Sequence, residues 1–177
     1  MSSIIKVNTY QDANGNALFS SDGSGNVTTS ASGLQNTPAF HVRKTSSQSI
    51  SYNTESLILW DYKYYDTDNA FDTSTYAFTV PTGKGGKYFL SSWYRTGTGV
   101  DNEGFQIWVN LNGTNNLNLG YGSSASLGYN TVRLTSVIDL SAGDVIKIYA
   151  FQNNNASSYD IAYAGQCGFH GFRLIGA

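Results

Sequence analysis

The densest group of chemically active side chains in this sequence is a set of aspartates between residues 61 and 72, interleaved with tyrosines. Its members are Asp61, Asp66, Asp68 and Asp72. Hard cations such as calcium take several oxygen ligands, which loop carboxylates and carbonyls can supply. The cluster is therefore a candidate calcium site, and the alternative is that these residues are solvated acids of surface loops.

A second acidic pair, Asp101 and Glu103, has the residue types of a glycosidase site. Such an enzyme needs two carboxylates across a groove, one of them with a raised pKa. Both residues fall in a polar stretch between expected strands. Two carboxylates in water have similar pKa values there, so neither is expected to have the raised pKa that the reaction needs. No serine occupies a Gly-x-Ser-x-Gly motif, which argues against an acyl-transfer triad of that type. We therefore expect a protein that is not an enzyme and has no catalytic residues.

Composition excludes several other classes. Charged residues make up 12% of the chain and the formal net charge is -2, so no basic stripe is available for phosphate groups and nucleic-acid binding is disfavoured. The single cysteine, Cys167, cannot form an internal disulfide, and we expect it to be a small buried side chain. The first residues lack the apolar core of a signal peptide and no run is long enough to span a membrane, so we expect synthesis in a host cytoplasm without membrane insertion.

The elements that must position these residues are expected to be strands. Aromatic residues make up 14% of the chain, and apolar side chains recur with period two. Phe105, Ile107, Val109 and Leu111 fall on one face of a strand that ends at Gly113. A similar strand is expected at Tyr76, Phe78 and Val80, and a turn at residues 141–144. From residue 36 onward the pattern predicts eight to ten short strands in a two-sheet jelly roll.

The first 35 residues differ from the rest. Ile5, Val7 and Tyr10 alternate as in a first strand, and a turn follows at residues 14–16. A second short strand at 17–19, a turn at 21–26 and a third strand at 27–29 complete the pattern of a small hairpin sheet. Strands this short and polar cannot bury a core alone, so partner chains or a larger particle must complete it. We therefore divide the chain into an attachment stem, 1–35, and a globular head, 36–177.

Six segments of the head, in order, resemble the globular head of complement q subunits, a family that shares the tumour-necrosis-factor jelly roll. They are residues 38–42, 57–61, 71–81, 86–90, 140–145 and 169–174. The last of them reads Phe-His-Gly-Phe-Arg-Leu, similar to the family's closing strand. Lys87 departs from the family, which usually has an apolar residue after this glycine, and the loop at 96–103 is long and polar.

The resemblance implies a homotrimer without a cofactor, with Tyr88, Phe169 and Leu174 in the core of each copy. Some heads of this kind bind calcium, which raises the interest of the aspartate cluster. It also makes the opening and closing strands neighbours. These strands contain the only two histidines, His41 and His170, which could share a site or could be strand-face residues hydrogen-bonded to their neighbours.

A binding surface would use loop aromatics for rigid contact area and amides for adaptable hydrogen bonds. The candidates for ligand binding are Trp93, Tyr94, Tyr121 and Tyr129. For Trp93 and Tyr94 the alternative is packing inside the sandwich or a trimer.

The stem, rich in Asn, Ser, Asp and Gly, resembles the amino-terminal segment of phage tail-fibre or capsid-fibre proteins. Together these features predict a virion structural protein: a trimeric fibre or decoration head that adheres to a host surface, binds its glycans, and contacts other virion proteins through residues 1–35. A soluble carbohydrate-binding module or adhesin outside a virion is the alternative, and a small fibre-borne depolymerase ranks third.

Overall fold

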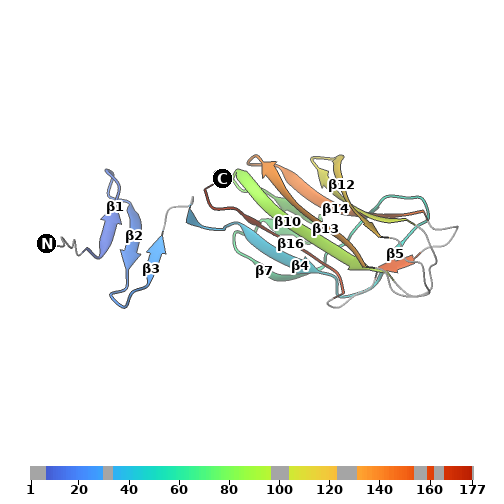
Figure 1. Cartoon of the computed structure of the whole chain (residues 1–177), viewed down its shortest axis with the longest axis horizontal. Helices are drawn as coiled ribbons and strands as arrows, with labels where there is room; N and C mark the ends of the chain where they lie inside the picture. The colour runs from blue at the N-terminus through green and yellow to red at the C-terminus, as the bar shows by residue number, and fades with distance from the viewer. Residues whose placement is uncertain are drawn as a thin grey trace.

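The computed structural model describes residues 7–29, 34–96, 104–122, 131–153, 159–161 and 166–176. Three short strands come first: β1 (Thr9–Gln11), β2 (Ala17–Ser21) and β3 (Val27–Thr29). They form an antiparallel sheet in the order β1-β2-β3. Figure 1 shows this N-terminal sheet beyond one end of a larger all-β body.

The larger body contains two main sheets. One has five strands in the order β13-β10-β16-β4-β7, each pair antiparallel. Its strands are β4 (Ala39–Arg43), β7 (Tyr62–Asp66), β10 (Gly86–Arg95), β13 (Thr131–Leu140) and β16 (Gly168–Arg173). Because β16 and β10 lie between strands distant in sequence, the connections cross between sheets, as in a jelly roll.

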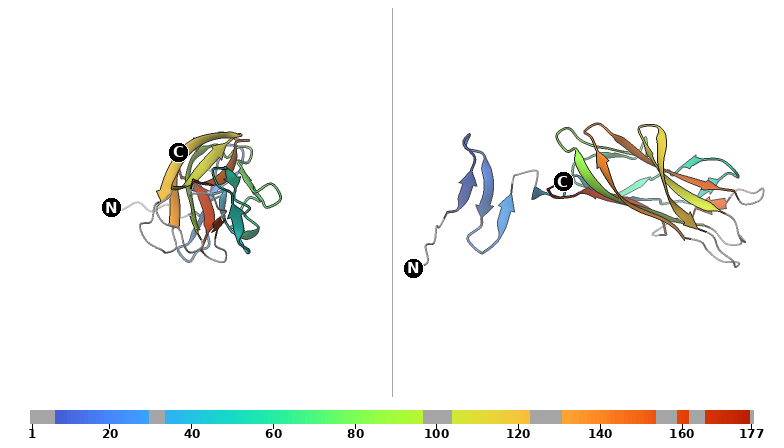
Figure 2. Two further views of the ribbon diagram at one scale, coloured as in Figure 1. Left: turned by 90° about the vertical axis from the view of Figure 1, so that its right-hand side faces the viewer. Right: turned by 45° about the horizontal axis from the view of Figure 1, so that its top comes forward.

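The second sheet has six strands in the order β12-β11-β14-β9-β8, with β6 also paired to β14. Its strands are β6 (Ser56–Leu57), β8 (Phe71–Asp72), β9 (Ala77–Thr79), β11 (Phe105–Leu111), β12 (Thr114–Gly122) and β14 (Val145–Gln152). A small sheet pairs β5 (Gln48–Ile50) with β15 (Tyr159–Ile161). The two views of Figure 2 show the main sheets packed over one another. The prediction of an all-β jelly roll is confirmed, although the described part of the head contains thirteen strands, β4 to β16, where eight to ten were predicted.

The core lies between the two main sheets and is rich in aromatic rings. Phe40 stacks on Phe78 with ring centroids 4.5 Å apart and meets Phe169 edge-on at 4.8 Å. Tyr88 is fully buried and donates a hydrogen bond from its hydroxyl to the Lys84 carbonyl at 2.6 Å. Burial raises the pKa of Tyr88 to about 12, so this hydroxyl stays protonated. The Tyr88 hydroxyl thus has a partner, whereas the indole N–H of Trp60, also fully buried in the core, has none among the described residues.

Two details differ from the sequence-based expectations. Leu174 is only partly buried and lies outside the core, because it follows the end of β16 where the sheet no longer covers it. Tyr76 is not a strand residue: its φ of 57° places it in the turn before β9.

Cys167 is buried, as expected. None of the described segments forms a helix of the length and apolarity needed to cross a membrane.

A candidate assembly and binding surface

The outer face of the five-stranded sheet carries aromatic side chains on four of its strands. We call this set the aromatic face: His41, Tyr62, Tyr64, Tyr65, Phe89, Trp93, His170 and Phe172. The alternation of β10 explains it, because Tyr88 and Leu90 point inward to the core and Phe89 points outward. Cross-strand pairing then places His170 beside His41 and Phe172 beside Phe89.

The rings of the aromatic face touch one another in a continuous series. Phe89 stacks on Phe172 at 5.2 Å and lies 6.2 Å from His170. His170 meets Trp93 and His41, each with centroids 5.6 Å apart. His41 continues the series to Tyr64 at 4.7 Å. These contacts run across four strands of the sheet.

Nothing in the described part of the chain covers this face. Tyr64 is 50% exposed and Tyr65 is 49% exposed, and Val137 on the neighbouring strand β13 is 54% exposed. Val137 pairs with Phe89 and so lies on the same side of the sheet. An antiparallel sheet with one buried face usually presents polar residues on the other. The outer face also bears Arg133 beside Trp93 and the Lys87–Asp139 ion pair. Its central rings nevertheless form an aromatic group of the kind that is typical of an interaction surface.

Charged side chains lie over and beside the aromatic face, where Arg133 pairs with Trp93 and Lys87 pairs with Asp139. The Arg43 guanidinium lies over the rings of Tyr62 and Tyr64, 4.6 and 4.8 Å from their centroids. The pKa of His41 is lowered by desolvation and, secondarily, by the nearby His170 and Arg43, and desolvation also lowers the pKa of His170. Both imidazoles are therefore neutral near pH 7. Hydrogen-bonded histidines were one expectation, but the contacts of both rings in the described part of the chain are aromatic.

Gly168 sets the position of Trp93. A Cβ atom at Gly168 would lie 2.5 Å from the Cη2 of Trp93, so only glycine lets the indole lie flat across β16. The two residues pair across the strands. The requirement for glycine here was not anticipated from the sequence, because the pairing joins distant segments.

The four candidates for ligand binding lie in different parts of the molecule. Trp93 lies on the aromatic face. Tyr94 is fully buried, and its hydroxyl donates to the Gln106 carbonyl at 3.0 Å, so it is a core residue and not a surface residue. Burial raises the pKa of Tyr94. Tyr121 lies in β12, paired with Gln106, and Tyr129 lies outside the described residues.

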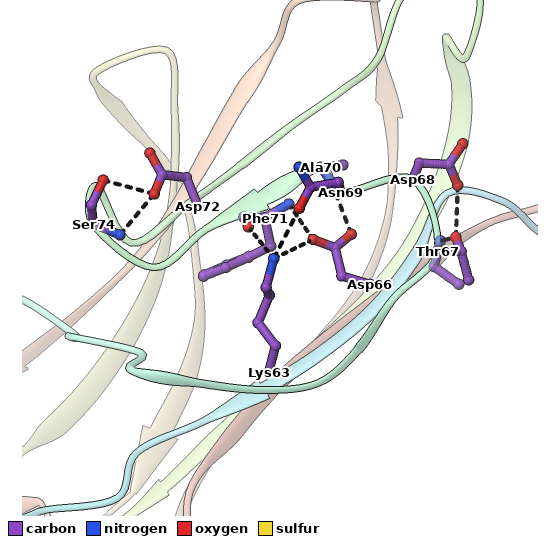
Figure 3. A network of polar contacts seen from close by, with 10 residues as sticks. Lys63, Asp66, Thr67, Asp68, Asn69, Ala70, Phe71, Asp72 and Ser74 are labelled. Carbon is purple, nitrogen blue, oxygen red and sulfur yellow. Dashed lines mark hydrogen bonds and ion pairs between the residues drawn. The ribbon is translucent and has the colours of Figure 1, made fainter.

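The aspartates of the sequence-predicted cluster have separate partners. Asp66 is 4% exposed, lies 3.2 Å from the Nζ of Lys63, and accepts hydrogen bonds from the backbone N–H groups of Ala70 and Phe71, both at 2.9 Å (Figure 3). The same Lys63 ammonium donates to the Asn69 side chain at 3.1 Å. The expectation of a solvated loop acid is therefore wrong for Asp66, which fixes the turn from β7 to β8.

The remaining acids bind nearby hydroxyl and amide groups. Asp61 accepts from the backbone N–H of Thr45 at 2.7 Å, and Asp68 accepts from the Thr67 hydroxyl at 2.6 Å. Hydrogen bonds, first from Ser74, lower the pKa of Asp72. Across the residues that the structure describes, no three metal-binding side chains converge. The four aspartates thus do not meet at one site. Asp101 and Glu103 lie outside the described residues.

A second aromatic group lies on the outer face of the six-stranded sheet. Trp108 on β11 stacks on Phe151 of β14 with centroids 5.4 Å apart and an interplanar angle of 18°. Tyr149 pairs with Trp108 across the strands, and Lys147 lies two residues along β14. We call Trp108, Lys147, Tyr149 and Phe151 the outer platform. Trp108 was not among the binding candidates selected from the sequence.

Comparison with known proteins supports the fold. The chain is 18% identical to the globular domain of zebrafish complement 1qA protein, with a TM-score of 0.56, covering 77% of this chain and 97% of that one. Murine APRIL at pH 5.0 is 16% identical, with a TM-score of 0.57 and coverage of 77% and 98%. The Eiger TNF of S. frugiperda is 13% identical, with a TM-score of 0.58 and coverage of 78% and 93%. No protein-family model and no curated protein matches the sequence. The chain therefore has the jelly-roll fold of complement q and tumour-necrosis-factor heads.

Proposed function

We propose that this chain is the homotrimeric head of a phage fibre or decoration protein, and that it serves in adhesion and not in catalysis. One observation carries the proposal: a jelly roll of the complement q and tumour-necrosis-factor kind leaves a continuous aromatic face uncovered. Phe89, Trp93 and Phe172 on this face are large side chains of the type that dominates the energetics of interfaces.

A closed trimer satisfies this face in a simple way. Each copy presents the same surface, and rotation about a three-fold axis buries all three copies of it without leaving a free edge. The two imidazoles are neutral, and Lys87 is paired with Asp139 at 3.1 Å, so these groups add little repulsion between copies. Arg43 lies over tyrosine rings and Arg133 lies beside Trp93, and an interface between copies must accommodate both of these cations.

Attachment to a particle is supported by the N-terminal sheet. It lies outside the head (Figure 1) and its composition resembles that of fibre stems. In this proposal residues 1–35 contact other virion proteins and the head points away from the particle.

Adhesion is supported by the outer platform. When the five-stranded sheets face the three-fold axis, the six-stranded sheets face outward and present the half-buried rings of Trp108 and Phe151. Flat aromatic rings beside the polar side chains of Gln106 and Lys147 suit neutral sugar rings, which bind by stacking and hydrogen bonds. Three copies would multiply weak contacts through avidity.

Sedimentation velocity of the full chain at micromolar concentration tests the assembly. We expect a particle of three times the 19.2 kDa chain mass. Phe89→Glu, on the aromatic face, is expected to give folded monomers, whereas Tyr149→Ser, on the outer platform, is a matched control that leaves the trimer intact. A monomeric parent protein would remove the proposal.

Labelling purified particles with antibodies against the head tests the virion role. Binding of the full chain to host-surface glycans, without release of reducing ends, tests adhesion against depolymerase activity. Glycan binding by a protein that is absent from particles would instead identify a soluble carbohydrate-binding module.

A further inference from the structure

The N-terminal sheet has an apolar face on which nothing packs in the described part of the chain. The register places Tyr10 opposite Phe19, and Val27 opposite Ser21, so that Tyr10, Phe19 and Val27 project to one side. Leu18, the next residue along β2 from Phe19, lies on the other side and is half-buried. Val7, Tyr10, Phe19 and Val27 are 48%, 52%, 40% and 67% exposed and border a shallow hollow. We call these four residues the stem face.

The turns on either side of β2 repeat one design. Asp12 accepts hydrogen bonds from the backbone N–H groups of Asn14 and Asn16 and from the Asn16 side chain, each at 2.9 Å. Ten residues later Asp22 accepts the equivalent bonds from residues 24 and 26, at 2.7, 3.2 and 2.6 Å. The glycine in each turn has a positive φ, 83° at residue 15 and 93° at residue 25.

The two turns contain all the charged side chains of the sheet. Asp12 and Asp22 are the only charged residues between 7 and 29, and both carboxylates are engaged in their turns. The stem face itself is therefore uncharged and can meet an identical face without repulsion. The hydrogen bonds of Asp12 and Asp22 set the length of each turn and so the register of the strands it joins. A slip of one residue would move Phe19 and Val27 to the other side of the sheet.

The sheet needs a covering partner. Strands of three, five and three residues with no opposing layer are at best marginally stable in water. Exposed apolar side chains continue from the stem face to the nearby end of the head, where Leu34 is 45% and Ile175 is 51% exposed. At that end of the head, the Arg173 N–H donates a hydrogen bond to the Pro38 carbonyl at 3.1 Å, which joins the end of β16 to the residue before β4.

The connection to the head indicates which partner covers it. The chain passes from β3 into β4, a strand of the sheet that bears the aromatic face. The Gln35 side chain donates to the Thr29 carbonyl at 2.7 Å, which ties the connection to the end of β3. Three heads assembled through their aromatic faces would place three N-terminal sheets together at the same end, the left end in Figure 1 and in the right-hand view of Figure 2.

We propose that the stem face packs against the stem faces of two other copies of this chain, forming a three-sided stem with a dry interior below the head. The inference rests on the proposed trimer. Copies of the chain fit the site better than a different virion protein, because the head connection brings identical, uncharged faces to millimolar effective concentration.

Pyrene attached to an introduced cysteine tests this contact in the full chain. Val27→Cys places the label on the stem face, and Thr28→Cys, the next residue of the same strand and also exposed, places it on the opposite side. The native Cys167 is buried and does not compete for the label. We expect excimer emission from the Val27 variant at micromolar concentration, unchanged on dilution while trimers persist, and monomer emission from the Thr28 variant.

The outcomes separate the stem from the head. Trimers by sedimentation with no excimer from Val27→Cys, or with equal excimer from both positions, overturn the stem contact and leave the head assembly standing. Monomers by sedimentation overturn both. As a second measurement, Phe19→Ser is expected to raise amide hydrogen exchange in residues 7–29 by about tenfold or more while the head stays trimeric. Unchanged exchange would contradict the proposal.

Discussion

Replacing Asp66 by alanine is expected to destabilise the head strongly, although the residue is the last of an edge strand, β7. Its carboxylate is 4% exposed, pairs with Lys63 at 3.2 Å, and accepts two backbone hydrogen bonds at 2.9 Å from Ala70 and Phe71. The substitution leaves two buried N–H groups and part of one ammonium without an acceptor.

The magnitude follows from these lost partners. Hydrogen bonds to a charged group contribute about 1.5 to 3 kcal/mol each, and they are not additive. Lys63 is 32% exposed, so water compensates part of its loss. We expect a decrease of about 3 kcal/mol in the free energy of unfolding, or about 6 to 12 °C in Tm for a chain of this size.

Thermal melts at one fixed protein concentration measure the effect, since an oligomer's Tm depends on concentration. Asp72→Ala is the matched control: this carboxylate is exposed and bonds only Ser74 and Thr75 in its own turn, so a loss below about 1 kcal/mol is expected. Equal losses from the two variants would refute the role given to burial. The same melts with calcium and then with chelator test the calcium hypothesis, and an unchanged parent Tm would remove it.

Three further outcomes are expected. Because the folded-state pKa values of His41 and His170 lie below the ordinary 6.5, the unfolded chain binds protons first as pH falls. Stability is therefore constant above about pH 6.5 and declines below it, and replacing both histidines by phenylalanine should flatten that decline in melts across pH. Gly168→Ala puts a Cβ 2.5 Å from the Trp93 ring and should cost about 1 to 3 kcal/mol while shifting tryptophan fluorescence. Tyr94→Phe should cost about 1 kcal/mol by urea denaturation, and unchanged glycan binding would confirm its place in the core.

The fold could be predicted because each strand shows which of its faces is buried. In β11, Phe105, Ile107 and Val109 are fully buried, as their period-two spacing indicated. The turn at residues 141–144 was predicted in the same way from its Gly and Asp. Gly143 has a φ of 90°, and the Asp144 carboxylate accepts a hydrogen bond from the Ser141 N–H. These features depend on residues close together in the chain.

The surface could be predicted only in part. An outward-pointing Phe89 or Trp108 can face water or a partner chain, and alternation alone does not distinguish the two. Tyr94 was selected as a surface candidate for its type, but its parity in β10 assigns it to the core. The aromatic series through His41 and His170 depends on pairing between the two ends of the head, which local patterns do not encode.

The acidic segment shows the same limit. Four aspartates within twelve residues suggested a shared cation. The most buried of them, Asp66, instead pairs with Lys63 and accepts hydrogen bonds from backbone N–H groups. Local hydrogen bonding of Asp and Asn to their own turns competes with metal binding and is strong wherever a chain is rich in these residues.

Uncharged polar side chains keep this charge-poor protein in solution, and uncharged aromatic rings would form most of the contact between copies in the proposed trimer. Ionic strength screens charge pairs, but it does not weaken contacts between aromatic rings, and sulfate or phosphate salts strengthen them. If the proposed trimer forms through the aromatic face, we therefore expect it to persist in brine as firmly as in dilute buffer, with salt screening the repulsion between Arg43 and Arg133 of different copies.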